Sequence, residues 1–352
     1  MSRLKPAAAL CVLLVTAVAA RAAALADARP IAIVIHGGAG VIEPARMTPA
    51  REASYRAGLE AALDAGYAVL ERGGTSLDAV TAAVRLMEDD PQFNAGRGAV
   101  LNHAGDAELD AAIMDGRGPR AGAVAAVRHV KNPIELARLV MDRSPHVLLV
   151  ADGAEDFALE QGVVLVPRSY FRTPAREHEL EEERRSAAAR GGARAAPAAG
   201  SADGALTGMG TVGAVALDRA GDLAAATSTG GITNKLPGRV GDSPLIGAGT
   251  YANNQSCAVS GTGQGEYFIR LVVAYDVCAL VQYRHLPLAR AVREVIHDKL
   301  QRSGGEGGVI ALDADGHIAM DFNSVGMFRG ARDSHGRREI GMYRDGAPPG
   351  HP

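Results

Sequence analysis

The junction Gly210-Thr211 is the feature that most constrains how this 352-residue chain can fold. The threonine lies directly after a glycine and heads Val212 to Leu217, a small apolar run with the character of a buried strand. Upstream, residues 172–207 are polar and low in apolar surface, so we expect a linker or disordered arm there. A structureless insertion of that length inside a compact domain needs a reason, and cleavage at its far end supplies one.

Such a junction allows the chain to cut itself. The Thr211 hydroxyl would attack the Gly210 carbonyl, the resulting ester would hydrolyse, and Thr211 would become a new N-terminus. A free α-amine has a pKa of about 7.7–8, against about 10.4 for lysine, so it can take the proton from its own residue's hydroxyl. The alternative is that Thr211 merely opens a buried strand.

Composition excludes several classes of protein. The net charge of -3 gives no indication of nucleic-acid or membrane attraction. With 43 glycines, no tryptophan and 4% aromatic residues, the core must bring backbones together in tight layers of strands and helices. Three cysteines argue against a disulfide scaffold. Cys257 and Cys278 have no metal-ligand spacing, so we expect them to be small buried hydrophobic side chains.

Residues 1–26 have the features of a secretory signal. Arg3 and Lys5 supply positive charge, an apolar stretch follows, and Ala24-Leu25-Ala26 is a small-residue cleavage site, with 17–19 as a second candidate. No later apolar run is as long as a membrane span. We therefore expect a soluble mature protein, periplasmic or secreted.

Strand and helix patterns occur in both halves of the chain. Strands are expected at residues 31–35, 109–114, 122–127, 147–150, 212–217, 223–228, 308–313 and 318–322. Helices are expected at residues 51–72, 77–87, 133–142, 266–282 and 288–301, with Ser76 as the N-cap of the second and a frayed tail from Asp345. This content is typical of a layered α+β or α/β body.

Two further threonine-glycine clusters follow the junction, at residues 227–231 and 260–265. Either one alone could be a loop whose hydroxyls bond local backbone. Together with Thr211 they offer a supporting hydroxyl and a pair of donors, because a threonine hydroxyl beside a glycine N–H can form an oxyanion hole. Between them, Arg239 and Asp242 could be a solvated loop pair, or the charges that hold the α-carboxylate and α-ammonium of a free amino-acid end.

The sequence does not match the motifs of other catalytic classes. The segment His36-Gly-Gly-Ala-Gly40 follows a strand but lacks the dinucleotide-binding spacing, because position 43 is glutamate. The G-x-S-x-G of a serine hydrolase is absent, and His178-Glu179 begins a zinc-protease pattern that ends in Glu182. The sequence indicates no hydrolytic metal site and no catalytic cofactor.

Six segments closely resemble the plant-type L-asparaginase / isoaspartyl peptidase family, which belongs to the N-terminal-nucleophile hydrolases. They are His36–Gly40, Phe93–Gly96, Gly210–Asp218, Thr227–Gly231, Gly238–Pro244 and Gly247–Asn254. The likeness covers roughly Ile31 to Phe328 apart from the linker. It implies a four-layer αββα sandwich, and a precursor cleaved between Gly210 and Thr211 into an α chain (27–210) and a β chain (211–352).

The resemblance also implies roles at the reacting centre. Thr211 would be the nucleophile and its amine the general base, with Thr229 supporting the hydroxyl. Thr262 and the Gly263 N–H would form the oxyanion hole, and Asn94 would lie nearby. His36 has no clear chemical role, whereas the glycines after it would govern autoprocessing and placement of the nucleophile.

For the substrate, the resemblance implies that Arg239 binds the α-carboxylate, while Asp242 and the Gly265 carbonyl bind the α-ammonium. It also implies a structural sodium ion held by backbone carbonyls in the loop from residue 87 to 97. The implied ligands are Met87, Glu88, Asp90, Phe93, Ala95 and Arg97. The expected assembly is a dimer of αβ units.

The implied activity is hydrolysis of β-aspartyl amide bonds in isoaspartyl dipeptides and in L-asparagine, with release of L-aspartate. One site can serve both small-molecule substrates, because they present the same free α-amino and α-carboxyl groups and differ in the leaving group. The alternatives are a glycosylasparaginase, whose leaving group is a glycosylamine, and a non-catalytic relative that only binds its ligand.

Overall fold

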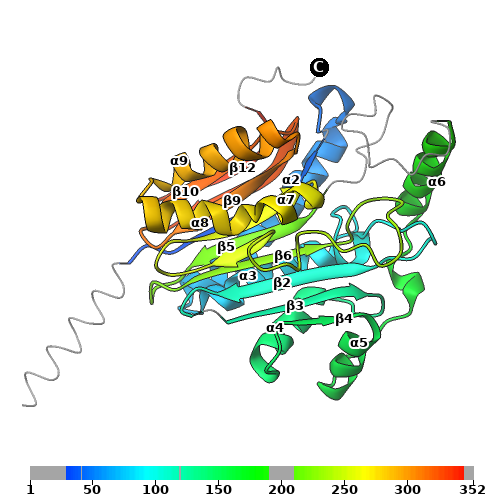
Figure 1. The fold of residues 1–352 in the computed structure, drawn as a ribbon, viewed down its shortest axis with the longest axis horizontal. Helices are drawn as coiled ribbons and strands as arrows, with labels where there is room; N and C mark the ends of the chain where they lie inside the picture. Colours follow the sequence, from blue (N-terminus) through cyan, green and yellow to red (C-terminus); the bar gives the residue numbers. More distant parts are fainter. Residues whose placement is uncertain (1–28, 41, 119, 190–209, 345–352) are drawn as a thin grey trace, which may run out of the picture.

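The protein is a four-layer αββα sandwich, as the sequence predicted (Figure 1). The structure is a computed structural model that describes residues 29–40, 42–118, 120–189 and 210–344. The larger sheet has the strand order β12-β11-β1-β5-β6-β2-β3-β4, and the smaller sheet has the order β10-β9-β8-β7. All neighbouring strands are antiparallel except β3 and β4, which are parallel.

The strands of the larger sheet are β1 (Ala32–Gly40), β2 (Leu109–Asp115), β3 (Arg120–Val127), β4 (Leu148–Val150), β5 (Val212–Leu217), β6 (Leu223–Thr229), β11 (Gly326–Asp333) and β12 (Arg338–Tyr343). Those of the smaller sheet are β7 (Thr250–Ala252), β8 (Cys257–Gly263), β9 (Gly307–Asp313) and β10 (Ile318–Phe322).

The α-helices are α2 (Pro49–Glu71), α3 (Ser76–Asp89), α4 (Pro133–Arg143), α5 (Ala151–Glu160), α6 (Pro174–Ala189), α7 (Gly265–Leu271), α8 (Val273–Arg284) and α9 (Leu288–Arg293). A π-helical turn, η4 (Glu294–Leu300), continues α9, and the short 3-10 turns are η1 (Pro44–Arg46), η2 (Gly96–Gly98), η3 (Arg168–Phe171) and η5 (Gln301–Ser303). None of the helices in these ranges is long and apolar enough to cross a membrane.

Alternating side chains of the central strands fill two different cores. On β1, Ile33 and Ile35 pack toward the outer helices α2 and α3, whereas Ala32 and Val34 pack between the two sheets. A third core lies between the smaller sheet and the helices α8 and α9. Strands buried on both faces read as continuous apolar runs, which explains the sequence of β1 and β5.

The two predicted subunits share one sheet. Strand β5, which follows the Gly210-Thr211 junction, pairs with β1 on one side and β6 on the other. In the larger sheet, strands from before the junction therefore pair with strands from after it at three places, β11–β1, β1–β5 and β6–β2. Cleavage would leave the two chains joined by backbone hydrogen bonds and a common core. Thr211 immediately precedes β5, an inner strand of the larger sheet.

Several predicted boundaries are corrected. The glycine run after His36 is the second half of β1, with a bulge between His36 and Gly38, because Gly38 adopts φ 115°. The side chain that caps α3 is Thr75, which accepts from the Asp78 N–H, and not Ser76. The single helix expected over residues 266–282 is two helices, since Val272 breaks it with φ 52°.

The predicted linker is structured in part. Residues 174–189 form α6, so the prediction of a linker or disordered arm is wrong there, whereas residues 190–207 of that linker, like the signal, lie outside the described residues. The helix is highly charged, yet Leu180 is buried and Arg176 pairs with Glu179 while donating to the Gly98 carbonyl. A few anchoring contacts hold a helix that has no apolar stripe.

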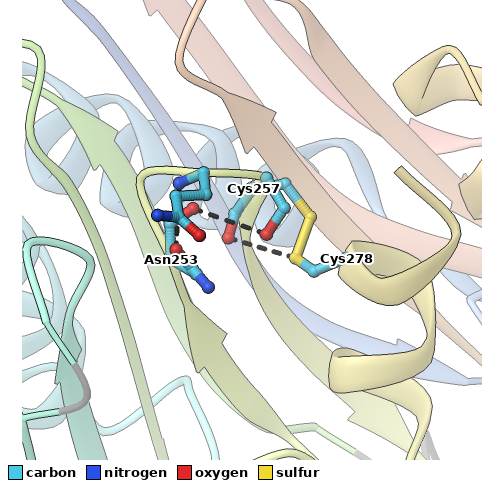
Figure 2. Close-up of a disulfide and its surroundings, with 5 residues drawn as sticks. Asn253, Cys257 and Cys278 are labelled. Carbon is cyan, nitrogen blue, oxygen red and sulfur yellow. Dashed lines mark hydrogen bonds between the residues drawn. A yellow bond between two sulfur atoms is a disulfide. The ribbon is translucent and has the colours of Figure 1, made fainter. Parts of the chain in front are cut away.

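The cysteine prediction is wrong in one respect. Cys257 and Cys278 are buried as expected, but they form a disulfide that joins the start of β8 to α8 (Figure 2). The two residues are 21 positions apart, and only the packing of the helix against the strand brings their Cα atoms to 5.3 Å. The bond fastens the strand that carries Thr262 to the helix layer behind it.

Candidate active site

Three threonines that are far apart in the sequence meet at the start of β5. The buried Thr211 donates its hydroxyl to Thr229 Oγ1 at 3.2 Å, and Thr229 Oγ1 also accepts the Gly231 N–H at 2.9 Å. The β5–β6 register pairs Val212 with Ser228, which places Thr211 beside Thr229. The hydroxyl of Thr211 is thereby held in one orientation.

Thr262 lies on the other side of Thr211. Its Oγ1 accepts hydrogen bonds from the Thr211 N–H at 3.4 Å and from the Ala39 N–H at 3.2 Å. Its hydroxyl hydrogen is not used in either bond and can be donated to another group. The next residue, Gly263, has φ 151°, and a Cβ there would lie 2.5 Å from the Glu306 carbonyl oxygen. Only glycine fits this turn of the backbone at the end of β8.

The backbone of Gly38 lies directly against the Gly210-Thr211 bond. A Cβ on Gly38 would be 2.5 Å from the Gly210 Cα and 3.3 Å from the Gly210 carbonyl carbon. Asn94 is on the same side, since a Cβ on Gly210 would be 3.6 Å from the Asn94 Cβ. The Asn94 amide donates to the Gly231 carbonyl and accepts from the Val100 N–H, so both of its ends have partners.

Two opposite charges, Arg239 and Asp242, lie close to Gly265. A Cβ on Gly265 would lie 2.9 Å from both Arg239 Nη2 and Asp242 Oδ1. Asp242 is buried, and its Oδ2 has no hydrogen-bond partner among the described residues. Burial raises the pKa of Asp242 to about 7, against the opposing effects of its backbone N–H and Arg239. A cationic partner would stabilise this carboxylate.

Glu266, which the sequence did not single out, holds one edge of the Arg239 guanidinium. Arg239 Nε and Nη2 donate to the two carboxylate oxygens of Glu266 at 3.0 and 3.1 Å. The remaining Nη1 faces Gly231 and Gly241, whose missing side chains leave space next to it. Arg239 is therefore oriented by its outer edge and presents the other edge to the site.

His36 has a defined place that sequence reasoning missed. Its Nδ1 lies 2.8 Å from the Thr211 carbonyl oxygen, and its Nε2 lies 2.8 Å from Ser260 Oγ. Complete burial lowers the pKa of His36 to about 3, so the ring is neutral at physiological pH. A histidine followed by glycines after a strand carries no signal for this contact.

This fold and this site define a class. A threonine that begins a central strand of an αββα sandwich, with hydroxyl and backbone partners on both sides, is the arrangement of the N-terminal-nucleophile hydrolases. Residues 29–342 match the asparaginase family. The chain belongs to that family.

Individual relatives extend the comparison over nearly the whole chain. The isoaspartyl peptidase of Salmonella typhimurium is 52% identical over 313 residues, covering 89% of this chain and 98% of the relative. That of Escherichia coli is 50% identical, with 89% and 96% covered. A probable isoaspartyl peptidase/L-asparaginase 2 of Arabidopsis thaliana is 42% identical, with 89% and 98% covered.

Proposed function

We propose that this protein is an isoaspartyl peptidase with L-asparaginase activity, which hydrolyses β-aspartyl amide bonds and releases L-aspartate. The observation that carries the proposal is the buried Asp242 carboxylate, which has an unpartnered oxygen and lies beside the Arg239 guanidinium. A free α-ammonium and α-carboxylate on one carbon match this pair of charges. The names of the similar proteins support the same substrate class.

The active form would arise by self-cleavage at Gly210-Thr211. In the continuous chain Thr211 N still belongs to that peptide bond, and the Thr211 hydroxyl is held by Thr229. Attack of the hydroxyl on the Gly210 carbonyl would give an ester, and water would release the two chains. Gly38 packs against the reacting carbon, so its missing side chain leaves room for the tetrahedral centre.

In turnover, the freed Thr211 amine would take the proton of its own hydroxyl while the oxygen attacks the β-carbonyl of the substrate. The Thr262 hydroxyl and the Gly263 N–H would stabilise the oxyanion, and the amine would return the proton to the leaving nitrogen. Water would then cleave the aspartyl ester by the same route and regenerate Thr211. Arg239, Asp242 and the Gly265 carbonyl would hold the aspartyl end throughout.

We also propose that the loop after α3 holds a structural monovalent cation such as sodium. A Cβ on Gly96 would lie 2.3 Å from the Glu88 carbonyl oxygen, and one on Gly98 would lie 2.1 Å from that of Phe93, so carbonyl oxygens line a tight turn. The C-terminus of α3 adds negative potential. The ligands would be Met87, Glu88, Asp90, Phe93, Ala95 and Arg97. Replacing sodium by tetramethylammonium should lower the Tm.

Export to the periplasm or medium is a further proposal. It rests on residues 1–26, and the Cys257–Cys278 disulfide supports it because such bonds persist in oxidising compartments. Pairing of two αβ units is proposed from the family resemblance. Cell fractionation tests the first of these, and the mass of the purified protein in solution tests the second.

Parallel kinetics on a β-aspartyl dipeptide, L-asparagine and a glycosylasparagine test the proposed function. We expect turnover of the first two, with L-aspartate as the common product. Preferential turnover of the glycosylasparagine would support the glycosylasparaginase alternative. Binding without turnover by the cleaved protein would support the non-catalytic one.

A further inference from the structure

A buried chain of polar side chains leads from the Thr211 carbonyl across both sheets. Its members are fully buried and come from four strands. They are His36 on β1, Ser260 on β8, Thr227 on β6 and Thr250 on β7. The successive contacts are 2.8 Å from His36 Nε2 to Ser260 Oγ, 2.7 Å to Thr227 Oγ1 and 2.6 Å to Thr250 Oγ1. None of these four belongs to the reacting groups described above.

One carbonyl sets the direction of the hydrogen bonds that begin this chain. The Thr211 carbonyl oxygen can only accept, so His36 Nδ1 must be the ring nitrogen that carries hydrogen. A neutral imidazole has one such hydrogen, so Nε2 must accept, and Ser260 must donate to it. Thr227 can then donate to Ser260 or to the Gly249 carbonyl, and Thr250 can donate to Thr227 or to the Ser243 carbonyl. The Thr211 carbonyl therefore sets the tautomer of His36, and the Ser260 hydroxyl stabilises that tautomer by donating to Nε2.

The hydrogen bond between His36 and Ser260 needs space that only a glycine at position 213 leaves free. Gly213 is the cross-strand partner of His36, and a Cβ on it would lie 2.0 Å from Ser260 Oγ and 2.4 Å from His36 Nε2. Any side chain at Gly213 would separate the two groups. Gly213, two residues after the nucleophile, thus has a second purpose besides forming part of a buried strand.

We propose that His36 is a positioning residue for the nucleophile: its Nδ1–H holds the Thr211 carbonyl, and the Ser260 hydroxyl holds the ring in place by donating to Nε2. The Thr211 carbonyl belongs to the bond with Val212, which survives cleavage. His36 therefore holds the threonine both while the precursor cuts itself and during turnover. This inference rests on the proposed function, because it assigns His36 to the same nucleophile.

The test is a set of three variants measured against the wild type. His36→Phe removes both hydrogen bonds, His36→Asn keeps a donor near the Nδ1 position, and Ser260→Ala removes the hydroxyl that donates to Nε2. Ser324→Ala is the matched control, since Ser324 is a buried serine whose hydroxyl donates to the Gly326 carbonyl in its own loop. Self-cleavage is followed on denaturing gels, and kcat and KM are measured on the cleaved fraction.

We expect His36→Phe to lower kcat and the self-cleavage rate by about 10- to 100-fold, with KM changed by less than about threefold, because the nucleophile is misplaced and the substrate site is intact. His36→Asn should recover part of both rates. Ser260→Ala should lower both by a smaller factor, and Ser324→Ala should change neither. If His36→Phe does not fold, the self-cleavage rates and kcat values of Ser260→Ala and His36→Asn test the proposal instead.

Nitrogen-15 spectra of the histidine rings provide a readout that a merely structural role would not give. In the wild type, the signals absent from His36→Asn should show a neutral ring protonated at Nδ1. An Nε2-protonated ring, wild-type rates in a folded His36→Phe, or a raised KM with normal kcat would overturn the proposal. Absence of turnover in the wild type would instead refute the proposed function.

Discussion

The two sides of the site around Thr211 differ in charge. The nucleophile side consists of buried neutral groups, namely the hydroxyls of Thr211, Thr229 and Thr262 together with the neutral ring of His36. The substrate side consists of charges, with Arg239 oriented by Glu266 next to the buried carboxylate of Asp242. Self-cleavage acts on a peptide bond without free charged ends. It should therefore need only the neutral side, whereas turnover should need both.

The largest effect is expected from removing the shared nucleophile. Thr211→Ala should abolish self-cleavage and lower turnover by roughly 10⁴-fold or more, because the attacking oxygen of both reactions is lost. Thr211→Ser, which keeps a hydroxyl, is the control and should retain part of both reactions. Gels and steady-state kinetics measure them together. Turnover by Thr211→Ala at the wild-type rate would show that Thr211 is not the nucleophile.

Removing the charge that binds the α-carboxylate should separate the two reactions. Arg239→Ala should leave self-cleavage unchanged and lower kcat/KM for free-ended substrates by about 10²–10³-fold, because a desolvated ion-pair partner is lost. The control is Arg270→Ala, an arginine on α7 that stacks on the Tyr267 ring. Unchanged L-asparagine turnover by Arg239→Ala would place the substrate elsewhere.

The acid limb of the pH profile should reveal Asp242. Its raised pKa of about 7 means that protonation begins near neutrality, and the protonated form cannot pair with the substrate ammonium. The Thr211 amine must also be neutral to act as the general base, so we expect kcat/KM to fall by more than about tenfold per pH unit below 7. In kcat the Asp242 contribution should move to lower pH, because the bound ammonium favours the carboxylate, whereas the contribution of the amine should remain. Acid limbs of the same steepness in both profiles would contradict this assignment.

The smallest effect is expected from releasing the outer edge of Arg239. Glu266 has a side chain that is 58% exposed, so its ion pair is partly screened. Glu266→Gln should raise KM by about two- to tenfold through a less ordered guanidinium, with kcat and self-cleavage unchanged. The same change in the Arg239→Ala background should add nothing. A fall in kcat alone would show that Glu266 acts at the reacting centre.

Local patterns predicted much of the fold. The β5–β6 and β9–β10 hairpins follow from apolar runs around turns with Gly221-Asp222 and Asp315-Gly316. Helix α2 follows from its buried stripe of Tyr55, Leu59 and Leu63. The meeting of Thr211 with Thr229 also follows from a hairpin, because its register fixes which residues lie opposite. The strands β11 and β12 were not predicted, since their charged and glycine residues interrupt any apolar run.

The features that escaped prediction depend on contacts between distant segments. Cys257 and Cys278 pair because α8 packs on β8, and Glu266 finds Arg239 27 residues away. The break at Val272 has no glycine or proline to indicate it. The position of His36 required the register of β1 with β5 and the absence of a side chain at Gly213. No local propensity carries that information.

A buried peptide bond must break before this enzyme is active, and the mass of the purified protein under denaturing conditions shows whether it has broken. We expect two chains, one of which begins at Thr211 with a free amine, and activity that rises in proportion to the cleaved fraction. A single uncleaved chain that hydrolyses β-aspartyl substrates at full rate would show that the bond need not break.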